Sequence, residues 1–202
     1  MVNVSFMETQ FGMTSPWQAG DVARTQAVQI IVLVTPPVSV TDTPLRETLS
    51  AVLAAPVARR VLALGGAGAD WLPAEFDLMG QRGGDYGERM AAALADAHAT
   101  AALPMLLLRA DALDITPDML EDAARSLISG EADATFGLAS DGGFWLLGLR
   151  RPDRSMVIGI PSPGEGAAGS AGRLLLDRLA SAGLRVALAP RLEIAGAPAL
   201  RF

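Results

Sequence analysis

The sequence contains no cysteine and no lysine, and His98 is its one histidine. The missing cysteines exclude a disulfide framework, thiolate zinc sites and cysteine nucleophiles. The missing lysines exclude Schiff-base chemistry and the lysine of a P-loop. A single histidine has no partner with which to form a histidine metal site or a catalytic triad. Any chemistry must therefore rest on carboxylates, arginines, hydroxyls and backbone amides.

Positive charge and long apolar runs are also scarce. The 22 acidic residues outnumber the 16 basic ones, and this balance argues against a nucleic-acid-binding surface. The longest apolar run, Val28 to Val34, has the length of a strand, whereas a membrane span needs about 20 residues. Residues 1–27 lack the cationic start and apolar middle of a signal peptide. We therefore expect a cytoplasmic protein with no membrane span and no nucleic-acid partner.

The chain of 202 residues has the length of one domain. We expect a leader over residues 1–27 that is poorly structured or packed on a partner, and a single domain over residues 28–202. The aromatic side chains of the leader make it a candidate for contacts between subunits of a homo-oligomer. From Val28 onward, short apolar runs alternate with segments of helical periodicity, and this alternation predicts a three-layer α/β fold with a mainly parallel sheet.

The segments that carry this prediction are short, and most are bounded by Gly or Pro. The predicted strands are residues 28–34, 60–64, 75–79, 104–108, 134–138, 144–149 and 185–188, and the predicted helices are residues 45–54, 86–100, 117–128 and 173–181. Thr43 and Pro44 are expected to open the first helix. Ligands of such folds bind beyond the carboxyl ends of the strands, so we expect the site in the loops 35–43, 80–88, 109–116 and 139–143.

Two aspartates follow the strand 104–108. Asp111 and Asp114 provide the oxygen ligands that a hard divalent cation prefers, and such an ion could bridge the phosphates of a nucleotide. The same residues also suit a turn and a helix cap, with Asp114 or Thr116 as the capping residue. The spacing alone leaves both interpretations open.

The segment from Gln81 to Arg89 is rich in glycine and charge. Gly83, Gly84 and Gly87 would let the backbone approach a ligand, and the next helix would offer its first amides to an anion. Arg82 and Arg89 could add bidentate contacts to phosphate. Alternatively, Asp85 caps the helix and Glu88 completes a capping box. Both interpretations can hold at once.

Three segments in a fixed order resemble the DUF2064 family of glycosyltransferase-A-like proteins, which are related to small nucleotidyltransferases. They are Gln81 to Met90, the end of the strand before Asp111, and Asp141-Gly-Gly-Phe-Trp-Leu-Leu-Gly-Leu149, and the match runs from about Val28 to Leu192. The resemblance implies a nucleotide-diphospho-sugar-transferase fold with a mixed, mainly parallel sheet. It also implies a nucleotide or nucleotide-sugar donor and a small-molecule acceptor.

The resemblance assigns roles to particular residues. Asp111 matches the first aspartate of a Gly-Thr-Asp-Ser-Pro-type motif and Asp114 its second, which implies that both hold Mg²⁺ or Mn²⁺ on the diphosphate. Asp141 would orient or deprotonate the acceptor, in a loop completed by Gly142 and Gly143. The residues expected beside the nucleotide are Pro36, Gln81, Arg82, Gly83, Gly84, Asp85, Gly87 and Arg89.

The sequence departs from the family pattern where charge is needed. The Lys-Thr-Arg segment that would hold phosphates is absent after Pro36-Pro37, and Arg46 is the nearest base. The Ser-Pro of the aspartate motif is replaced by Ala112-Leu113. A C-terminal Asp-Val-Asp-type segment, which would supply a second metal ligand, is Glu193-Ile-Ala195 here.

Three hypotheses follow from this mixture. The first is a metal-dependent glycosyl or nucleotidyl transferase in which Asp111 and Asp141 are catalytic. The second is a degenerate relative that binds a ligand or a protein without transfer. The third is a metal-independent enzyme in which Arg82, Arg89 and Arg109 replace the ion.

Overall fold

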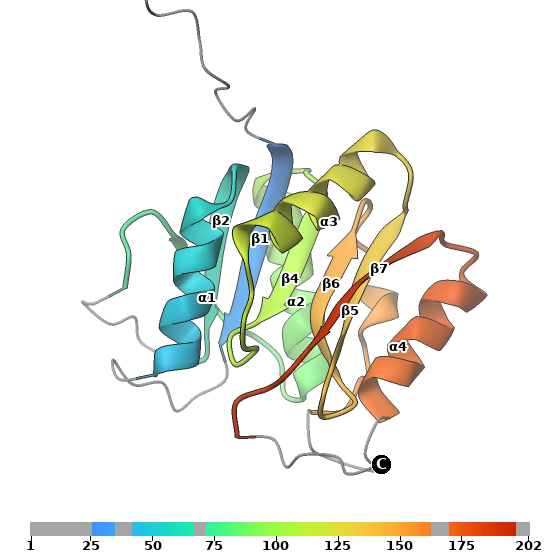
Figure 1. The fold of residues 1–202 in the computed structure, drawn as a ribbon. Coiled ribbons are helices and arrows are strands. Elements are labelled where there is room, and N and C mark those ends of the chain that lie inside the picture. The colour runs from blue at the N-terminus through green and yellow to red at the C-terminus, as the bar shows by residue number, and fades with distance from the viewer. Residues whose placement is uncertain (1–25, 35–41, 67–71, 163–169, 197–202) are drawn as a thin grey trace, which may run out of the picture.

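The computed structural model describes residues 26–34, 42–66, 72–162 and 170–196, in which a seven-stranded sheet lies between helices (Figure 1). The strands are β1 (Gln26–Val34), β2 (Val57–Leu64), β3 (Asp77–Gly80), β4 (Met105–Arg109), β5 (Ala134–Ala139), β6 (Phe144–Leu149) and β7 (Val186–Leu192). The helices are α1 (Thr43–Ala54), α2 (Tyr86–Thr100), α3 (Pro117–Ser129), the short 3₁₀ helix η1 (Arg154–Met156) and α4 (Ser170–Ser181). The leader predicted over 1–27 lies almost entirely outside the described residues.

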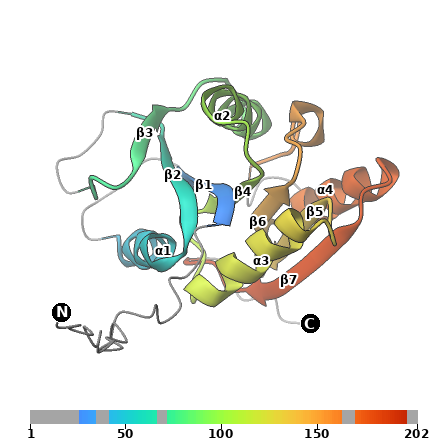
Figure 2. The same ribbon diagram turned by 90° about the horizontal axis from the view of Figure 1, so that it is seen from above.

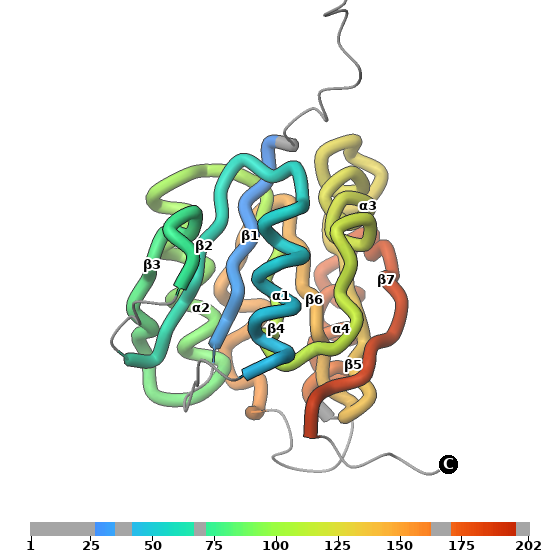
Figure 3. Tube along the Cα trace, turned by 60° about the vertical axis from the view of Figure 1, so that its left-hand side comes forward, coloured from blue at the N-terminus to red at the C-terminus, as the bar shows by residue number. Residues whose placement is uncertain are grey.

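The sheet has the strand order β3-β2-β1-β4-β6-β5-β7. All neighbouring strands are parallel except β6, which runs antiparallel to both β4 and β5. The chain passes through β1, β2 and β3 toward one edge, and α2 then returns it to β4 on the other side of β1 (Figure 3). The carboxyl ends of β1 and β4 therefore form the topological switch point, where ligands of open α/β sheets bind. The predicted three-layer, mainly parallel α/β fold is confirmed.

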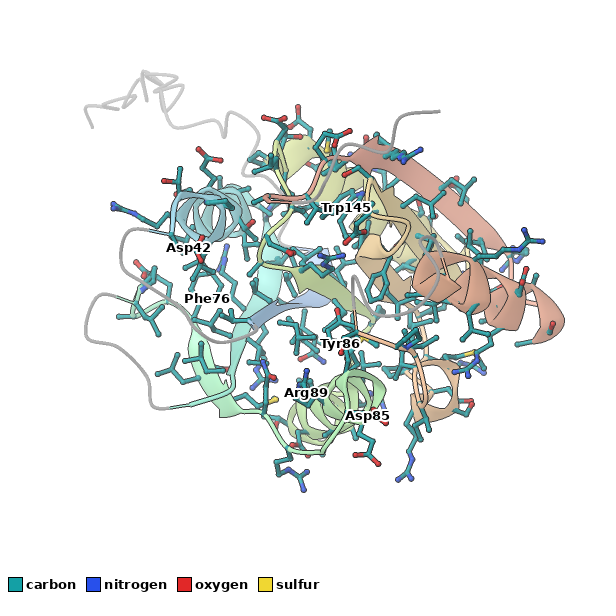
Figure 4. The ribbon with its side chains drawn as sticks, turned by 90° about the horizontal axis from the view of Figure 1, so that it is seen from below. Asp42, Phe76, Asp85, Tyr86, Arg89 and Trp145 are labelled. Carbon is teal, nitrogen blue, oxygen red and sulfur yellow. The ribbon has the colours of Figure 1, made fainter. Side chains whose placement is uncertain are left out.

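The helices cover the sheet in pairs. Helices α1 and α3 lie on one face, and α2 and α4 lie on the other (Figure 2). Strands β4 and β6 are buried along their whole length, which explains why both read as continuous apolar runs rather than as an alternation. Trp145 belongs to the core beneath α1 and α3, whereas Tyr86 belongs to the core beneath α2 and α4 (Figure 4). None of the helices in the described part of the chain is long and apolar enough to cross a bilayer.

Local capping fixes where the helices begin. Asp42 caps α1 by accepting a hydrogen bond from the Leu45 amide at 3.3 Å, one residue earlier than the cap predicted at Thr43. Thr116 caps α3 with a proline directly after it, as the Thr-Pro pair indicates. Gly130, with φ at 85°, ends α3 in the left-handed conformation that glycine tolerates best. Helices α1, α2 and α3 each follow a parallel strand, so their N-termini lie at the carboxyl edge of the sheet.

Candidate functional site

Arg109, the last residue of β4, is the centre of a charged cluster at this edge. Its side chain is only 7% exposed. The guanidinium donates two hydrogen bonds to Asp111, from Nε to Oδ1 at 2.9 Å and from Nη2 to Oδ2 at 2.7 Å. Its Nη1 atom donates to Oδ2 of Asp141 at 2.8 Å. Burial opposes the charge, but the hydrogen bonds to both aspartates and the charge of Asp111 outweigh it and raise the pKa of Arg109 above its ordinary value.

The backbone after β4 is held in place by the segment after β7. Ala112 and Ile194 form an antiparallel bridge. The Ala195 amide donates to the Asp111 carbonyl at 2.9 Å, and the Leu113 amide donates to the carbonyl of Glu193, also at 2.9 Å. The segment that resembles a second metal-ligand region therefore does lie beside Asp111. The residue whose amide meets Asp111 is alanine and supplies no carboxylate.

The turn between β5 and β6 positions the Asp141 carboxylate so that it accepts a hydrogen bond from the guanidinium of Arg109. The Gly143 amide donates to Oδ1 of Asp141 at 2.9 Å, and Gly142 has φ at 81°. A Cβ atom on Gly143 would lie 3.0 Å from both Nη1 of Arg109 and Oδ1 of Asp141. The start of α4 also rests on this turn, because the Gly172 amide donates to the Gly142 carbonyl at 3.1 Å. The glycines of this turn therefore leave room for the ion pair.

Tyr86, the first residue of α2, brings a neutral hydroxyl to the cluster. Its side chain lies between α2 and the sheet (Figure 4), and the residue is 3% exposed. Its hydroxyl is buried and has no hydrogen-bond partner in the described structure. Burial raises the pKa of Tyr86, and the charges of Arg109, Asp111, Asp141 and Arg89 also act on it.

Sequence reasoning missed Tyr86 and treated Arg109 only as a substitute for an ion. The signals were present in the sequence. Tyr86 is the one tyrosine of the chain and stands inside the glycine-rich segment. Arg109 is a charged residue that ends an otherwise apolar strand. A charged side chain at the end of a buried strand requires an oppositely charged or hydrogen-bonding partner, because burying an unpaired charge is costly.

The glycine-rich segment uses most of its polar groups within itself. Asp85 and Glu88 form the predicted capping box, and the Gly84 amide donates to Glu88 at 2.7 Å. Arg82 pairs with Asp96 along the outer side of α2. Arg89 donates to the Gly84 carbonyl at 2.9 Å.

Gln81 and Gly87 have structural contacts too. Gln81 Nε2 donates to the carbonyls of Val34 at 2.6 Å and Ala63 at 2.8 Å, and thus joins the ends of β1 and β2. A Cβ atom on Gly87 would lie 2.7 Å from the Gly159 amide nitrogen, so this glycine is needed where α2 crosses the segment after η1. Pro36 lies outside the described residues. The nucleotide-binding roles of this group stay predictions.

The metal implied for this edge does not fit the residues as they are arranged. Both oxygens of Asp111 accept hydrogen bonds from Arg109, and both oxygens of Asp141 are also used. Asp114 is exposed with φ at 61°. Within residues 26–34, 42–66, 72–162 and 170–196, no three acidic or histidine side chains are grouped so that they could hold an ion. The cation at this edge is the guanidinium.

An open groove of about 560 Å³ lies between α1 and the start of α3, on the face of the sheet opposite the core that contains Tyr86. Its volume is within the range of small-molecule sites. The residues that line it are Thr43, Arg46, Glu47, Ser50, Ala51, Ile115 and Pro117. Ile115 follows the loop that carries Asp111, so the groove and the cluster share one loop of the chain.

The family model described as "Uncharacterized protein conserved in bacteria (DUF2064)" matches residues 48–162, more than half of the chain. The chain belongs to the DUF2064 family. Among proteins of curated function, none matches the sequence. The family resemblance predicted from the three segments is thereby confirmed.

Several solved structures share the fold of this DUF2064 protein. A Desulfovibrio desulfuricans G20 protein, provisionally assigned as a nucleotide-diphospho-sugar transferase, has a TM-score of 0.70 and 21% identity over 84% of this chain and 82% of its own. Glucosyl-3-phosphoglycerate synthase from Mycobacterium tuberculosis, in complex with Mn²⁺, UDP and glucosyl-3-phosphoglycerate, has a TM-score of 0.55 and 16% identity, with 84% and 71% covered.

A third structure is the mannosyltransferase PcManGT from Pyrobaculum calidifontis in complex with GDP-Man and Mn²⁺. Its TM-score is 0.53 and its identity 18%, and the match covers 90% of this chain and 61% of the mannosyltransferase. At these identities the likeness establishes the fold alone. The fold is glycosyltransferase-A-like, as the family resemblance implied.

Proposed function

We propose that this DUF2064 protein is a transferase that acts on a nucleotide-activated donor, with the cluster around Arg109 at the centre of its site. The proposal rests on the buried, unpartnered hydroxyl of Tyr86 together with the ion pairs of Arg109. The Tyr86 hydroxyl is buried and has no hydrogen-bond partner among the described residues, and the charges of Arg109, Asp111 and Asp141 at the switch point of the sheet act on it. Buried polar groups are nearly always hydrogen-bonded, so such a hydroxyl indicates a missing partner.

The charge of the cluster indicates which part of a donor it would meet. Arg109, Asp111 and Asp141 sum to −1, Tyr86 is neutral, and Arg89, which lies 5.9 Å from the Tyr86 ring, brings the total around the hydroxyl to zero. Such a cluster has no excess of positive charge for phosphate and favours uncharged hydroxyl groups, which can donate to Asp111 and accept from Tyr86. Asp111 is 46% exposed at its side chain and can reach a ligand, whereas Asp141 is 12% exposed. We therefore assign ligand contact to Asp111 and the orientation of Arg109 to Asp141.

The phosphates of the donor would lie in the groove between α1 and α3. Arg46 and Glu47 both line this groove, so its net charge is zero, and the Arg46 guanidinium would supply the paired hydrogen bonds to phosphate oxygens. The first amides of α1 and the positive end of its dipole would add to the attraction. In this arrangement the phosphates and the hydroxyl-bearing part of the donor would lie on either side of the carboxyl edge of the sheet, joined across the loop that follows β4.

A second candidate function is binding without transfer. Asp141, which the family resemblance places on the acceptor side, uses both carboxylate oxygens within the protein. A carboxylate that is engaged in this way is poorly placed to take a proton from an acceptor. This observation favours a DUF2064 protein that retains the ligand site and has lost the reaction.

Calorimetric titration with a panel of nucleoside triphosphates and nucleotide sugars, with and without Mn²⁺, tests the proposal. We expect one member to bind, with loss of binding in Asp111→Ala and full binding in Asp122→Ala, which removes an equally charged but exposed carboxylate of α3. Turnover of that member with a hydroxylated acceptor then separates the two candidates. No binding by any member to the folded protein would overturn both nucleotide proposals.

A further inference from the structure

The guanidinium of Arg109 does for the two aspartates what a bound ion does in a metal site. Asp111 and Asp141 come from different loops, and their negative charges repel each other unless a cation lies between them. Arg109 reaches both at hydrogen-bond distance, from 2.7 to 2.9 Å. Its Nη1 also approaches the Phe144 carbonyl at 3.5 Å, so four of the five N–H groups of the guanidinium face protein oxygens.

The surrounding backbone is built around this arginine. A side chain at position 143 would be crowded, because its Cβ would lie 3.0 Å from Nη1 of Arg109 and from Oδ1 of Asp141, and the ion pair would have to shift to admit it. The loop after β4 is joined to the segment after β7 by two backbone hydrogen bonds, which form the bridge between Ala112 and Ile194. Divalent ions require several oxygen ligands at about 2.0–2.6 Å, and within the described residues no third acidic side chain joins Asp111 and Asp141 to form such a set. The position between the aspartates is therefore shaped for a planar guanidinium.

Arg82 and Arg89, the other two arginines that could replace an ion, form their contacts with residues other than Asp111 and Asp141. Arg82 pairs with Asp96 on the outer side of α2. Arg89 donates to the Gly84 carbonyl, and its guanidinium lies 5.9 Å from the centre of the Tyr86 ring. Of Arg82, Arg89 and Arg109, the one that forms ion pairs with Asp111 and Asp141 is Arg109.

We propose that Arg109 is the resident cation of this site and that the site assembles and binds its ligand without Mg²⁺ or Mn²⁺. Arg109 acts as a positioning residue: it fixes the carboxylate of Asp111 for ligand contact and neutralises one of the two aspartate charges. The proposal rests on the proposed function only in taking this cluster as the ligand site. Its core, the replacement of the ion by a guanidinium, is testable without any donor.

The test is a titration of the full chain with Mn²⁺ alone, in which the electron paramagnetic resonance signal of the free aqueous ion reports binding. The wild-type protein is expected to leave millimolar Mn²⁺ free. Arg109→Met removes the charge and leaves two facing carboxylates, so this variant is expected to bind Mn²⁺. At Mn²⁺ tenfold above the dissociation constant, its melting temperature should rise by about 3 °C or more.

Matched variants make the result specific. Arg125→Met also removes an arginine that bridges two acidic side chains, but on the exposed surface of α3, and it should neither bind Mn²⁺ nor respond to it. Adding Asp141→Asn to Arg109→Met should abolish the gained binding. If Arg109→Met is recovered unfolded, refolding with Mn²⁺ but not with sodium chloride of equal ionic strength is the expected outcome.

Two results would overturn the proposal. One is Mn²⁺ binding by the wild-type chain that Asp111→Asn removes. The other is an Arg109→Met variant that neither binds Mn²⁺ when folded nor refolds with it. Since the titration contains no nucleotide, its failure would leave the transferase proposal untouched. Conversely, a chain that binds no nucleotide could still show the exchange of arginine for metal.

Discussion

Asp141→Asn should destabilise the protein because it breaks the more deeply buried half of the Arg109 cluster. Asp141 is 12% exposed at its side chain and Arg109 is 7% exposed, so water cannot readily replace the lost interaction. Removing one partner of a buried ion pair typically costs about 3–5 kcal/mol. Here Asp111 continues to neutralise Arg109, and the new amide oxygen can still accept from Gly143. We therefore expect a loss of about 2–3 kcal/mol, or roughly 4–12 °C in melting temperature.

Urea denaturation, followed by tryptophan fluorescence and circular dichroism, measures this loss. Asp111→Asn should cost less, about 1 kcal/mol, because the Asp111 side chain is 46% exposed and partly solvated. Asp122→Asn, at an exposed ion pair of α3, is the control and should stay within about 0.5 kcal/mol of wild type. Raising the salt concentration should leave the Asp141→Asn loss nearly unchanged, since buried pairs are little screened. A loss at Asp141 no larger than that at Asp111 would show that burial does not set the strength of these two ion pairs.

Three further predictions concern other parts of the chain. Gly87→Ala should cost about 2 kcal/mol or more of unfolding free energy in urea, because its Cβ would collide with the backbone of residues 157–160. Tyr86→Phe should leave the protein at least as stable as wild type in a thermal melt, since it removes a buried hydroxyl that has no partner, yet it should weaken binding of the donor found by calorimetry. Hydrogen bonds from Arg185 lower the pKa of Asp133 to about 2, so this contribution to stability is present above about pH 4 and lost as the pH falls toward 2. In Asp133→Asn, stability should change less over that interval, which acid titration by circular dichroism checks.

The fold could be predicted largely because its strands are apolar on both faces and its helices carry clear start signals. The strand over 28–34, the Thr-Pro pair before α3 and the turn at Asp141 each matched the structure closely. The cap of α1 was displaced by one residue, because Asp42 and Thr43 are both good capping residues and local sequence does not rank them. Such ambiguity affects the ends of elements more than their existence.

The candidate site was harder to predict, because its contacts join residues that are distant in sequence. The pairing of Arg109 with Asp141 spans 32 positions, and no periodicity reports it. Spacing suggested that Asp111 and Asp114 would act together, but the backbone turns at Asp114 with φ at 61°, and Arg109 engages Asp111 instead. The glycines near Asp85 were weighed as ligand contacts or as structural residues, and the structure supplies a packing reason for Gly87.

If the cluster around Arg109 binds a nucleotide-activated donor without a divalent ion, the donor should perturb this cluster in the presence of a chelator. Amide chemical-shift mapping with the best-binding nucleotide sugar measures this. We predict shifts at Asp111, Gly143 and Tyr86 that appear in chelator and are unchanged when Mn²⁺ is added. Shifts that appear only after Mn²⁺ is added, or that leave these three amides unmoved, would contradict this prediction.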